Sequence, residues 1–253
     1  MATLDLPVPA RALALGAHPD DVEFGAGATL AKWAEAGCEV SLVVCTDGSK
    51  GTWDPAADLS TLVATRQTEA SSAAARLGAT GEVVFLSRVD GELENDRATR
   101  SELARCIRRL RPDVLLGHDP WKRYRLHPDH RAAGFLTCDA LVAARDPHFF
   151  ADHGVAPLRP GTLLLFEADE PDHAERVKPT HVDAKIAALE AHESQYESTM
   201  FIDTGSGTDS ARDQVTAAER ARFHAEVRAG VAEAGAWAGV EAAERYRLVP
   251  TDR

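Results

Sequence analysis

The amino-acid sequence predicts an α/β protein built around a mostly parallel sheet with helices on both faces. Short apolar runs alternate with helical patterns along the first 150 residues, which is typical of βαβ units. The apolar runs are continuous, as in strands that are buried on both faces. The length of 253 residues and the hydrophobic content of 44% suit one domain with a large core, and no clear domain boundary is visible.

Each element is expected from an apolar run, a helical pattern or a local stop signal. The expected strands are 13–17, 39–45, 82–86, 113–117 and 162–166. The expected helices are 27–36, 62–77, 102–110, 128–144, 182–194 and 211–228. Gly78 closes the second helix, Pro112 stops the third, and Pro128 lies in the opening turn of the fourth. The segment 201–210 is expected to be a polar loop.

Polar loops follow four of the expected strands. Parallel strands end at the same edge of an open sheet, and ligands bind outside that edge. The four loops contain residues 18–21, 46–52, 88–91 and 118–130. We therefore expect side chains that are far apart in the sequence to converge on one site.

Charge and composition narrow the range of partners. The formal net charge of −12 disfavours binding to nucleic acid or to an anionic membrane. No run approaches the roughly 18 apolar residues of a membrane span, and the first residues lack the basic segment of a secretory signal. We expect a cytoplasmic protein that binds no organic cofactor. The cysteines are expected to be free thiols: Cys38, Cys45, Cys106 and Cys138.

The string His18-Pro19-Asp20-Asp21 has the composition of half a metal site. His18 and Asp21 can fold back toward one point as metal ligands, because Pro19 stiffens the turn between them. Asp20 would then be free to accept a proton from a water on the metal.

The string His127-Pro128-Asp129-His130 can supply the other half. His130 would complete a set of two histidines and one carboxylate, which leaves positions open for water and substrate. A protonated His127 would stabilise the oxyanion or protonate the leaving amine, and Asp129 would orient His127.

The same residues allow other interpretations. Asp20 and Asp21 could cap a helix, and the second string could be a proline-opened helix start. A dinucleotide fingerprint is disfavoured, because Gly16, Gly25 and Gly27 do not have its spacing. A non-haem iron oxygenase also uses two histidines and one carboxylate, but the free carboxylate of Asp20 favours activation of water. A non-catalytic metal-binding or sugar-binding module would need neither Asp20 nor His127.

The two strings resemble those of the LmbE/PIG-L family of metal-dependent de-N-acetylases. The similarity covers roughly the first 150 residues, through 17–30, 46–52, 66–70, 90–91 and 127–130. The resemblance implies a Rossmann-like three-layer fold with the site at the carboxyl ends of the strands. It also implies one domain over 1–253, in which 1–150 is the core and 151–253 shapes the substrate pocket.

By matching position, the resemblance implies a role for each motif residue. It makes His18, Asp21 and His130 the ligands of Zn²⁺ or Fe²⁺, Asp20 the general base, and His127 the oxyanion-stabilising histidine with Asp129 behind it. It places Arg66 and Asp90 on the substrate. Here Val22 and Glu23 follow the first string, whereas several sugar deacetylases have an acid directly after it. This departure weakens the inference about substrate but not the inference about metal.

The expected reaction is hydrolysis of a linear amide, most simply de-N-acetylation of an N-acetylglucosamine-type sugar. Amidase action on a thiol conjugate or an antibiotic intermediate is the alternative. Members of the family form trimers or hexamers, so a homo-oligomer is expected. Further residues that could line the cavity or its rim are Asp47, Lys50, Trp53, His118, Glu167 and His192.

Overall fold

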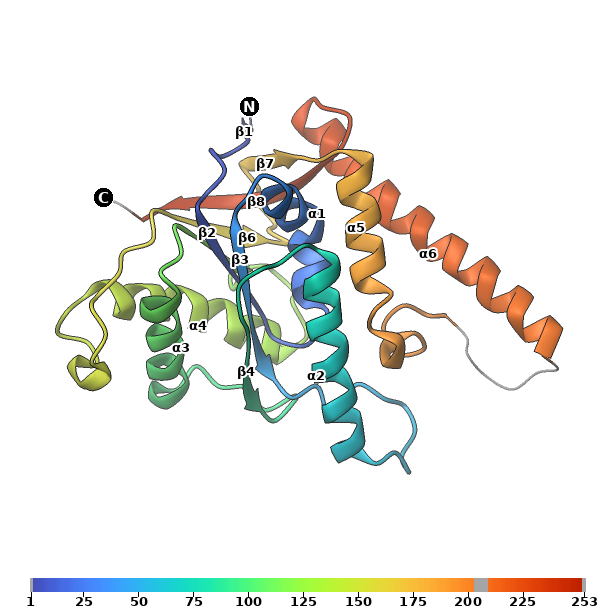
Figure 1. Ribbon diagram of the computed structural model, residues 1–253, viewed down its shortest axis with the longest axis horizontal. Coiled ribbons are helices and arrows are strands. Elements are labelled where there is room, and N and C mark those ends of the chain that lie inside the picture. The colour runs from blue at the N-terminus through green and yellow to red at the C-terminus, as the bar shows by residue number, and fades with distance from the viewer. Residues whose placement is uncertain (1, 203–208, 252–253) are drawn as a thin grey trace.

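One mixed sheet forms the centre of this computed structural model, which describes residues 2–202 and 209–251 (Figure 1). Its strands are β1 (Thr3–Leu4), β2 (Arg11–Gly16), β3 (Glu39–Thr46), β4 (Val83–Arg88), β5 (Val114–His118), β6 (Thr162–Phe166), β7 (His173–Arg176) and β8 (Ala243–Pro250). Their order across the sheet is β1-β7-β8-β6-β5-β2-β3-β4. Strands β2 to β6 are parallel, and β8 is antiparallel to both β6 and β7. The predicted α/β fold with a mostly parallel sheet is confirmed.

Helices cover both faces of the sheet (Figure 1). They are α1 (Asp21–Glu35), α2 (Leu59–Arg76), α3 (Arg97–Leu110), α4 (Pro128–Arg145), α5 (Pro179–Leu189) and α6 (Asp209–Ala238), with the 3₁₀ helices η1 (Ala151–His153) and η2 (Glu193–Gln195). None of the helices in the described residues has both the length and the apolar character that a membrane crossing requires.

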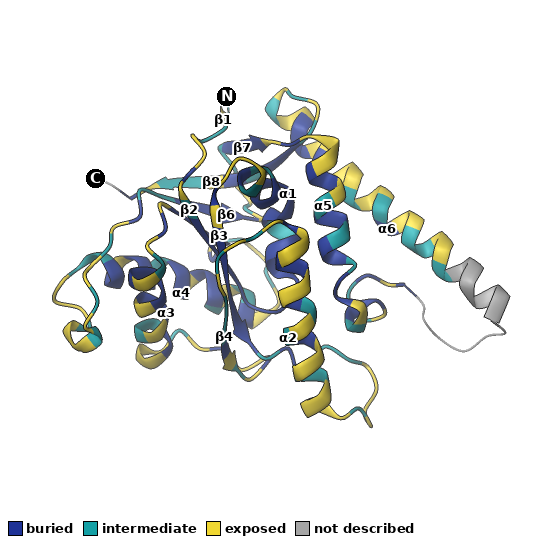
Figure 2. Ribbon diagram, viewed as in Figure 1, coloured by how far each residue is buried: buried dark blue, intermediate teal, exposed yellow. Residues whose placement is uncertain are grey.

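Strand β2 lies inside the sheet, between β5 and β3, and shows why the sheet needs two helical layers. Ala12 and Ala14 belong to the core beneath α1, whereas Leu13 and Leu15 belong to the core beneath α3 and α4. Successive side chains of a strand point to opposite faces, so a continuous apolar run must be covered on both sides. Figure 2 shows this strand as buried along its length.

The strands expected from apolar runs are all present, with ends no more than two residues from those expected. Strands β1, β7 and β8 were not expected. The sequence of β7 is HAER and that of β8 is AERYRLVP, and neither contains a long apolar run. Strand β8 joins β7 to the sheet through antiparallel pairing, in which polar side chains are common on the exposed face, and β1 adds to β7 in parallel.

Several helix ends differ from those expected. The first helix begins at Asp21 rather than at 27, and the third begins at Arg97 rather than at 102, because the Asp96 side chain accepts from the Thr99 amide. Helix α5 ends at Leu189 rather than at 194, and α6 continues to Ala238 rather than stopping at 228. Most of the polar loop expected at 201–210 lies outside the described residues.

Helix α1 approaches the sheet closely at Gly25. A Cβ atom at this position would lie 2.5 Å from Cδ2 of Phe166, a fully buried side chain on β6. Only a residue without a side chain allows this distance, so Gly25 fixes how near the start of α1 lies to the sheet.

Replacing Gly25 with alanine is expected to force α1 away from Phe166. The overpacking should lower the free energy of unfolding by about 1–3 kcal/mol, measured by urea denaturation. The control is Gly230→Ala on α6, where an added Cβ meets no atom within 4 Å and the higher helix propensity of alanine should leave stability unchanged or raised. Equal stability of the two variants would contradict this account.

Candidate metal centre and catalytic cavity

Loops from the carboxyl ends of β2, β3, β4 and β5 meet at one edge of the sheet, as the sequence predicts. Together with residues after β6 and α5 they enclose a cavity of about 550 Å³. The cavity is lined by His18, Asp20, Asp21, Phe24, Lys50, Gly51, Thr52, Trp53, Arg66, Asp90, Gly91, His127, His130, Glu167, Gln195, Ser198 and Thr199.

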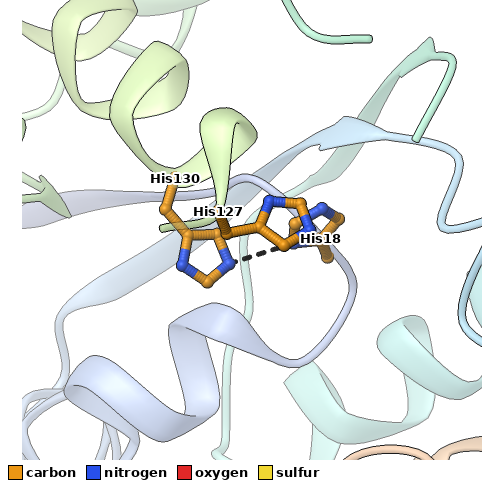
Figure 3. Close-up of side chains that lie close together, drawn as sticks. All are labelled: His18, His127 and His130. Atoms are coloured by element: carbon orange, nitrogen blue, oxygen red, sulfur yellow. Dashed lines mark hydrogen bonds between the residues drawn. The ribbon is translucent and has the colours of Figure 1, made fainter. Parts of the chain in front are cut away.

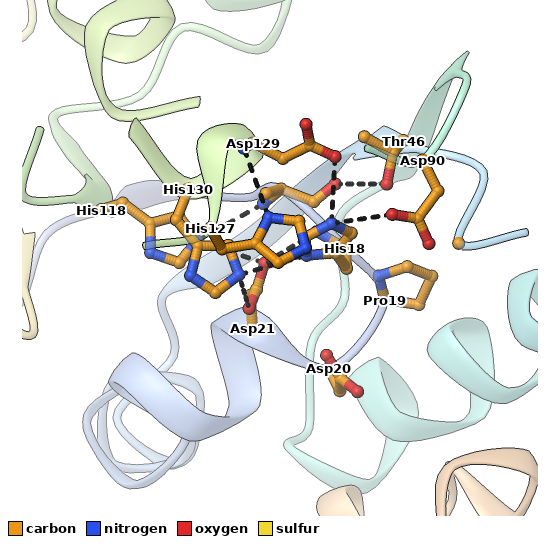
Figure 4. A network of polar contacts seen from close by, with 12 residues as sticks. His18, Pro19, Asp20, Asp21, Thr46, Asp90, His118, His127, Asp129 and His130 are labelled. Carbon is orange, nitrogen blue, oxygen red and sulfur yellow. Dashed lines mark hydrogen bonds and ion pairs between the residues drawn. The ribbon is translucent and has the colours of Figure 1, made fainter. Parts of the chain in front are cut away.

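The three predicted metal ligands, His18, Asp21 and His130, contact one another (Figure 4). His18 Nδ1 lies 3.2 Å from His130 Nε2 and 3.3 Å from Asp21 Oδ2, and His130 Nε2 lies 3.3 Å from Asp21 Oδ1. The imidazole of His18 comes from the loop after β2 and that of His130 from the first turn of α4, and the two face each other (Figure 3).

These separations fit a metal ion. A cation about 2.0–2.1 Å from each of three tetrahedral donors separates those donors by about 3.3–3.4 Å. The donor set is mixed nitrogen and oxygen, which suits zinc or ferrous iron. The spacing of His18, Asp21 and His130 therefore suits a divalent cation.

The far side of His18 is arranged for the same purpose. His18 Nε2 lies 3.2 Å from Asp90 Oδ1 and 3.2 Å from Asp129 Oδ2. A proton on Nε2 shared with these carboxylates leaves the lone pair of Nδ1 for a cation. Burial lowers the pKa of His18, but the carboxylates of Asp129, Asp21 and Asp90 outweigh it and raise the pKa well above its usual value. The surroundings of His18 thus attract positive charge.

Asp129 does not occupy the position expected for it. Its carboxylate accepts from the amides of Gly91 (2.6 Å) and Leu93 (3.1 Å) and contacts His18, whereas it is the backbone amide of Asp129 that donates to His127 Nδ1 at 3.3 Å. The expected carboxylate contact with His127 is therefore replaced by one with His18. The amides of the loop after β4 draw the carboxylate there.

His127 lies at the mouth of the cavity beside both imidazoles. Its ring centroid is 4.6 Å from that of His18 and 4.9 Å from that of His130. Burial and the nearby charge of His18 lower the pKa of His127, so the ring is neutral near pH 7. Because Nδ1 accepts a hydrogen bond, the proton of the neutral ring is on Nε2, which can donate. The protonated form expected from the sequence is thus not favoured.

His118 and Glu167 extend the site beneath Asp21. His118 is buried at the end of β5, with Nε2 3.2 Å from Asp21 Oδ2 and Nδ1 3.2 Å from Glu167 Oε2. Burial raises the pKa of Glu167, but His118 and Arg125 outweigh burial and lower it to about 2. His118 therefore orients Asp21 from behind, in line with its place at a strand end.

Arg125, in the loop before α4, contacts a predicted ligand. Its Nη1 lies 2.7 Å from His130 Nδ1, and its Nη2 donates to Glu167 Oε2 at 2.6 Å. A guanidinium can only donate, so His130 Nδ1 is the acceptor and the proton of this ring is on Nε2. A cation on Nε2 requires this proton to move and Arg125 to turn away.

Asp20 faces the cavity and does not cap α1. Its backbone is left-handed, with φ of 110°, and its side chain makes no capping hydrogen bond. Burial raises the pKa of Asp20 to about 6, against the opposing charge of Arg66. The capping interpretation is therefore wrong for Asp20, and its carboxyl titrates near the range in which a general base works.

Arg66 is buried and joins two of the loops. It donates to the carbonyls of Pro19 (2.7 Å) and Gly48 (2.9 Å) and lies 3.4 Å from Asp20 Oδ2. These contacts hold the first string in place, which a role toward substrate alone would not require. Arg66 still lines the cavity, as does Asp90.

The chain after residue 150 also contributes to the cavity wall. Gln195 is buried and donates to the Gly51 carbonyl at 3.1 Å, and Ser198 donates to the same carbonyl at 3.2 Å. His192 is fully buried, with Nε2 3.7 Å from Glu23 Oε1. Of these three residues, only His192 is among the candidates named from the sequence, so Gln195 and Ser198 are added by the structure.

Comparisons with known proteins place these features in context. Residues 13–141 match the family model described as PIG-L: GlcNAc-PI de-N-acetylase. The chain is 33% identical over 189 residues to the diacetylchitobiose deacetylase of Thermococcus kodakarensis, covering 74% of this chain and 70% of that protein. It is 32% identical over 253 residues to a 1D-myo-inositol 2-acetamido-2-deoxy-alpha-D-glucopyranoside deacetylase of Streptomyces avermitilis, covering 76% and 85%. The N,N'-diacetylchitobiose deacetylase of Pyrococcus horikoshii, solved with an inhibitor, has a TM-score of 0.80 at 27% identity, covering 96% of this chain and 84% of that one.

Fold and cavity define an α/β enzyme whose site lies at the carboxyl edge of a parallel sheet. The sequence matches of the chain narrow the class of enzyme, because the relatives are named as deacetylases, which hydrolyse N-acetyl amide bonds. The chain belongs to the PIG-L family of de-N-acetylases. The resemblance inferred from the two His/Asp strings is thereby confirmed.

The raised pKa of Asp20 makes a prediction for the metal-free protein. A carboxyl whose pKa is higher in the folded state favours folding below its unfolded pKa, and this contribution is lost as pH rises through about 6. Asp20→Asn should therefore stabilise the chelator-treated protein at pH 8 by on the order of 2 kcal/mol. The gain should shrink toward pH 4, as followed by urea unfolding. A gain that did not change with pH would contradict the raised pKa.

Proposed function

We propose that this protein is a zinc- or iron-dependent deacetylase of an N-acetylglucosamine-type sugar or conjugate. The observation that carries the proposal is the mutual contact of His18 Nδ1, His130 Nε2 and Asp21 at 3.2–3.3 Å, with Asp20 beside them in one cavity. A binding module would need the three ligands, but it would not need a buried carboxyl with a pKa of about 6.

The residues divide the chemistry between them. A divalent cation on the three ligands would polarise the amide carbonyl and make a water more acidic. Asp20 accepts the proton of the attacking water and later returns it to the departing amine. Neutral His127 donates from Nε2 to the oxygen that gains negative charge in the transition state. Asp90 and Asp129 hold His18 by its other nitrogen.

The shape of the cavity favours a sugar as substrate. The side chain of Trp53 lines it, is 80% exposed and therefore does not cover the core. A smaller cavity of about 230 Å³ shares Trp53 and Ser198 with the main one. An exposed indole that lines two neighbouring cavities suits a substrate with a second ring beyond the acetamido sugar. The named substrates of the relatives are sugars of this kind.

Other expectations stay predictions. The participation of Gln195 and Ser198 supports one domain in which 151–253 shapes the pocket. Direct contact of Arg66 or Asp90 with substrate, assembly into trimers or hexamers, and a cytoplasmic location are proposed on the family resemblance.

The test is release of acetate from N-acetylglucosamine, diacetylchitobiose and an N-acetylglucosaminyl-inositol by protein loaded with zinc or iron. Asp20→Asn should lower kcat by about 10²–10⁴-fold and keep the metal. His130→Ala should lose metal by elemental analysis. The control His148→Ala, which alters an exposed loop residue, should keep both the metal and the original kcat. Absence of acetate release from all three compounds with both metals would leave a binding module as the better description.

Trp53→Ala should raise KM for diacetylchitobiose by about 3–10-fold, because stacking on an aromatic ring contributes about 1 kcal/mol. For the monosaccharide the change should be smaller, since it does not reach the second ring's position. Trp121→Ala is the matched control, as this indole is 62% exposed and does not line the cavity. Equal effects of the two substitutions in steady-state assays would exclude Trp53 from substrate binding.

A further inference from the structure

A buried lysine–glutamate pair contacts the middle of α1 from outside the active-site cavity. Lys185 lies on α5 and Glu244 on β8, with Nζ 2.6 Å from Oε1 and side chains that are only 8% and 4% exposed. Taking two charges out of water is unfavourable, and hydrogen bonds to their remaining donors and acceptors are needed to offset it. The partners of the pair therefore show what its burial achieves.

Both charged groups bind the backbone of α1. Lys185 Nζ donates to the carbonyl of Phe24 at 2.7 Å. Glu244 accepts from the amides of Ala28 at 3.2 Å and Thr29 at 2.7 Å. In an uninterrupted α-helix the Ala28 amide donates to the Phe24 carbonyl. The pair thus places a cation at the end of the first turn and an anion at the start of the next, as the helix dipole favours.

The sequence of α1 is adapted to this contact. A Cβ atom at Gly27 would lie 3.0 Å from Cγ of Lys185, so a side chain here would crowd the lysine. The hydroxyl of Tyr246 also donates to Glu244 Oε2 at 3.1 Å. Glu244 therefore has four donors, and its carboxylate is held rigidly against α1.

The turn ahead of the contact carries the catalytic candidates. The Phe24 amide donates to the carbonyl of Asp20 at 3.0 Å, so the two ends of this turn move together. Asp21 lies in the same turn and contacts His130 and His118. Phe24 lines both the active-site cavity and a second cavity of about 240 Å³ that Lys185 and Glu244 line. The turn therefore has space on its far side into which it could shift.

We propose that Lys185 and Glu244 are positioning residues for the deacetylation. The pair fixes the angle of the first turn of α1, and through that turn it sets where Asp20 and Asp21 stand relative to His130. This inference rests on the proposed function for its catalytic consequence, but the geometric consequence is independent of any substrate.

A second ion pair on the same helix, partly buried, serves as a control. Lys32 Nζ lies 2.7 Å from Glu175 Oε2 and 2.7 Å from Asp5 Oδ1. This pair connects the last turns of α1 to β7 and to the segment after β1 through side chains. Its removal should cost stability without reaching Asp21.

The experiment compares Glu244→Gln and Lys185→Met with Lys32→Met, each assayed below its Tm. The first two should lower kcat by about tenfold or more, since small misplacements of catalytic groups are costly, while KM changes by no more than about twofold. Lys185→Arg should restore part of kcat. Lys32→Met should lower Tm and leave kcat within about twofold of the original.

Nitrogen-15 spectra of the histidine rings in metal-free protein supply a readout that needs no activity. Glu244→Gln should shift the ring signals of His118 and His130, because their contact with Asp21 changes, and Lys32→Met should not. If Lys185→Met fails to fold, Glu244→Gln, which keeps one acceptor oxygen, decides the outcome. Ring signals unchanged in Glu244→Gln would overturn the proposal. If Glu244→Gln shifts the ring signals but the unsubstituted protein releases no acetate, the result would contradict the proposed function alone.

Discussion

The imidazole of His18 is the point at which the separate segments of the site meet. His18 lies in the loop after β2, and the loop after β4 and the starts of α1 and α4 all place a polar group within 3.3 Å of it. A parallel sheet brings these segments to one edge, but only a group that binds on two sides can connect them. The side chain of His18 does so, with carboxylates on Nε2 and the prospective cation site on Nδ1.

Next to His18, the protein buries two carboxyl groups at the positions where the proposed reaction would need them. Asp20 is buried next to Asp21, and its pKa of about 6 reflects burial that Arg66 only partly offsets. Asp21 behaves oppositely: burial raises its pKa, but His118, His18 and His130 outweigh it and hold the pKa well below the usual value. Two adjacent carboxyls thus have pKa values shifted in opposite directions by their neighbours, as the proposed roles of ligand and base require.

Sequence reasoning reached the parallel core and the motif residues because both depend on local patterns. An apolar run is visible without its neighbours, and His-Pro-Asp-Asp and His-Pro-Asp-His each lie directly after a strand or at a helix start. It missed β7 and β8, whose polar sequences become strands only through antiparallel pairing. It also misassigned the partner of Asp129, because the amides of Gly91 and Leu93 that bind this carboxylate come from a distant loop. Arg125 could not be singled out, since its contact with His130 depends on tertiary geometry.

The insertion of β8 between β6 and β7 has a consequence for how the protein is made. Glu244 reaches the amides of α1 across 216 and 215 positions of sequence. On the ribosome, all the histidines and carboxylates of the candidate metal site emerge long before this strand does, and contacts of such long range are formed slowly. A nascent chain would therefore carry the full set of donors while the first turn of α1 still lacks its final support. The candidate site would reach its active geometry only when β8, the last strand to be synthesised, joins the sheet.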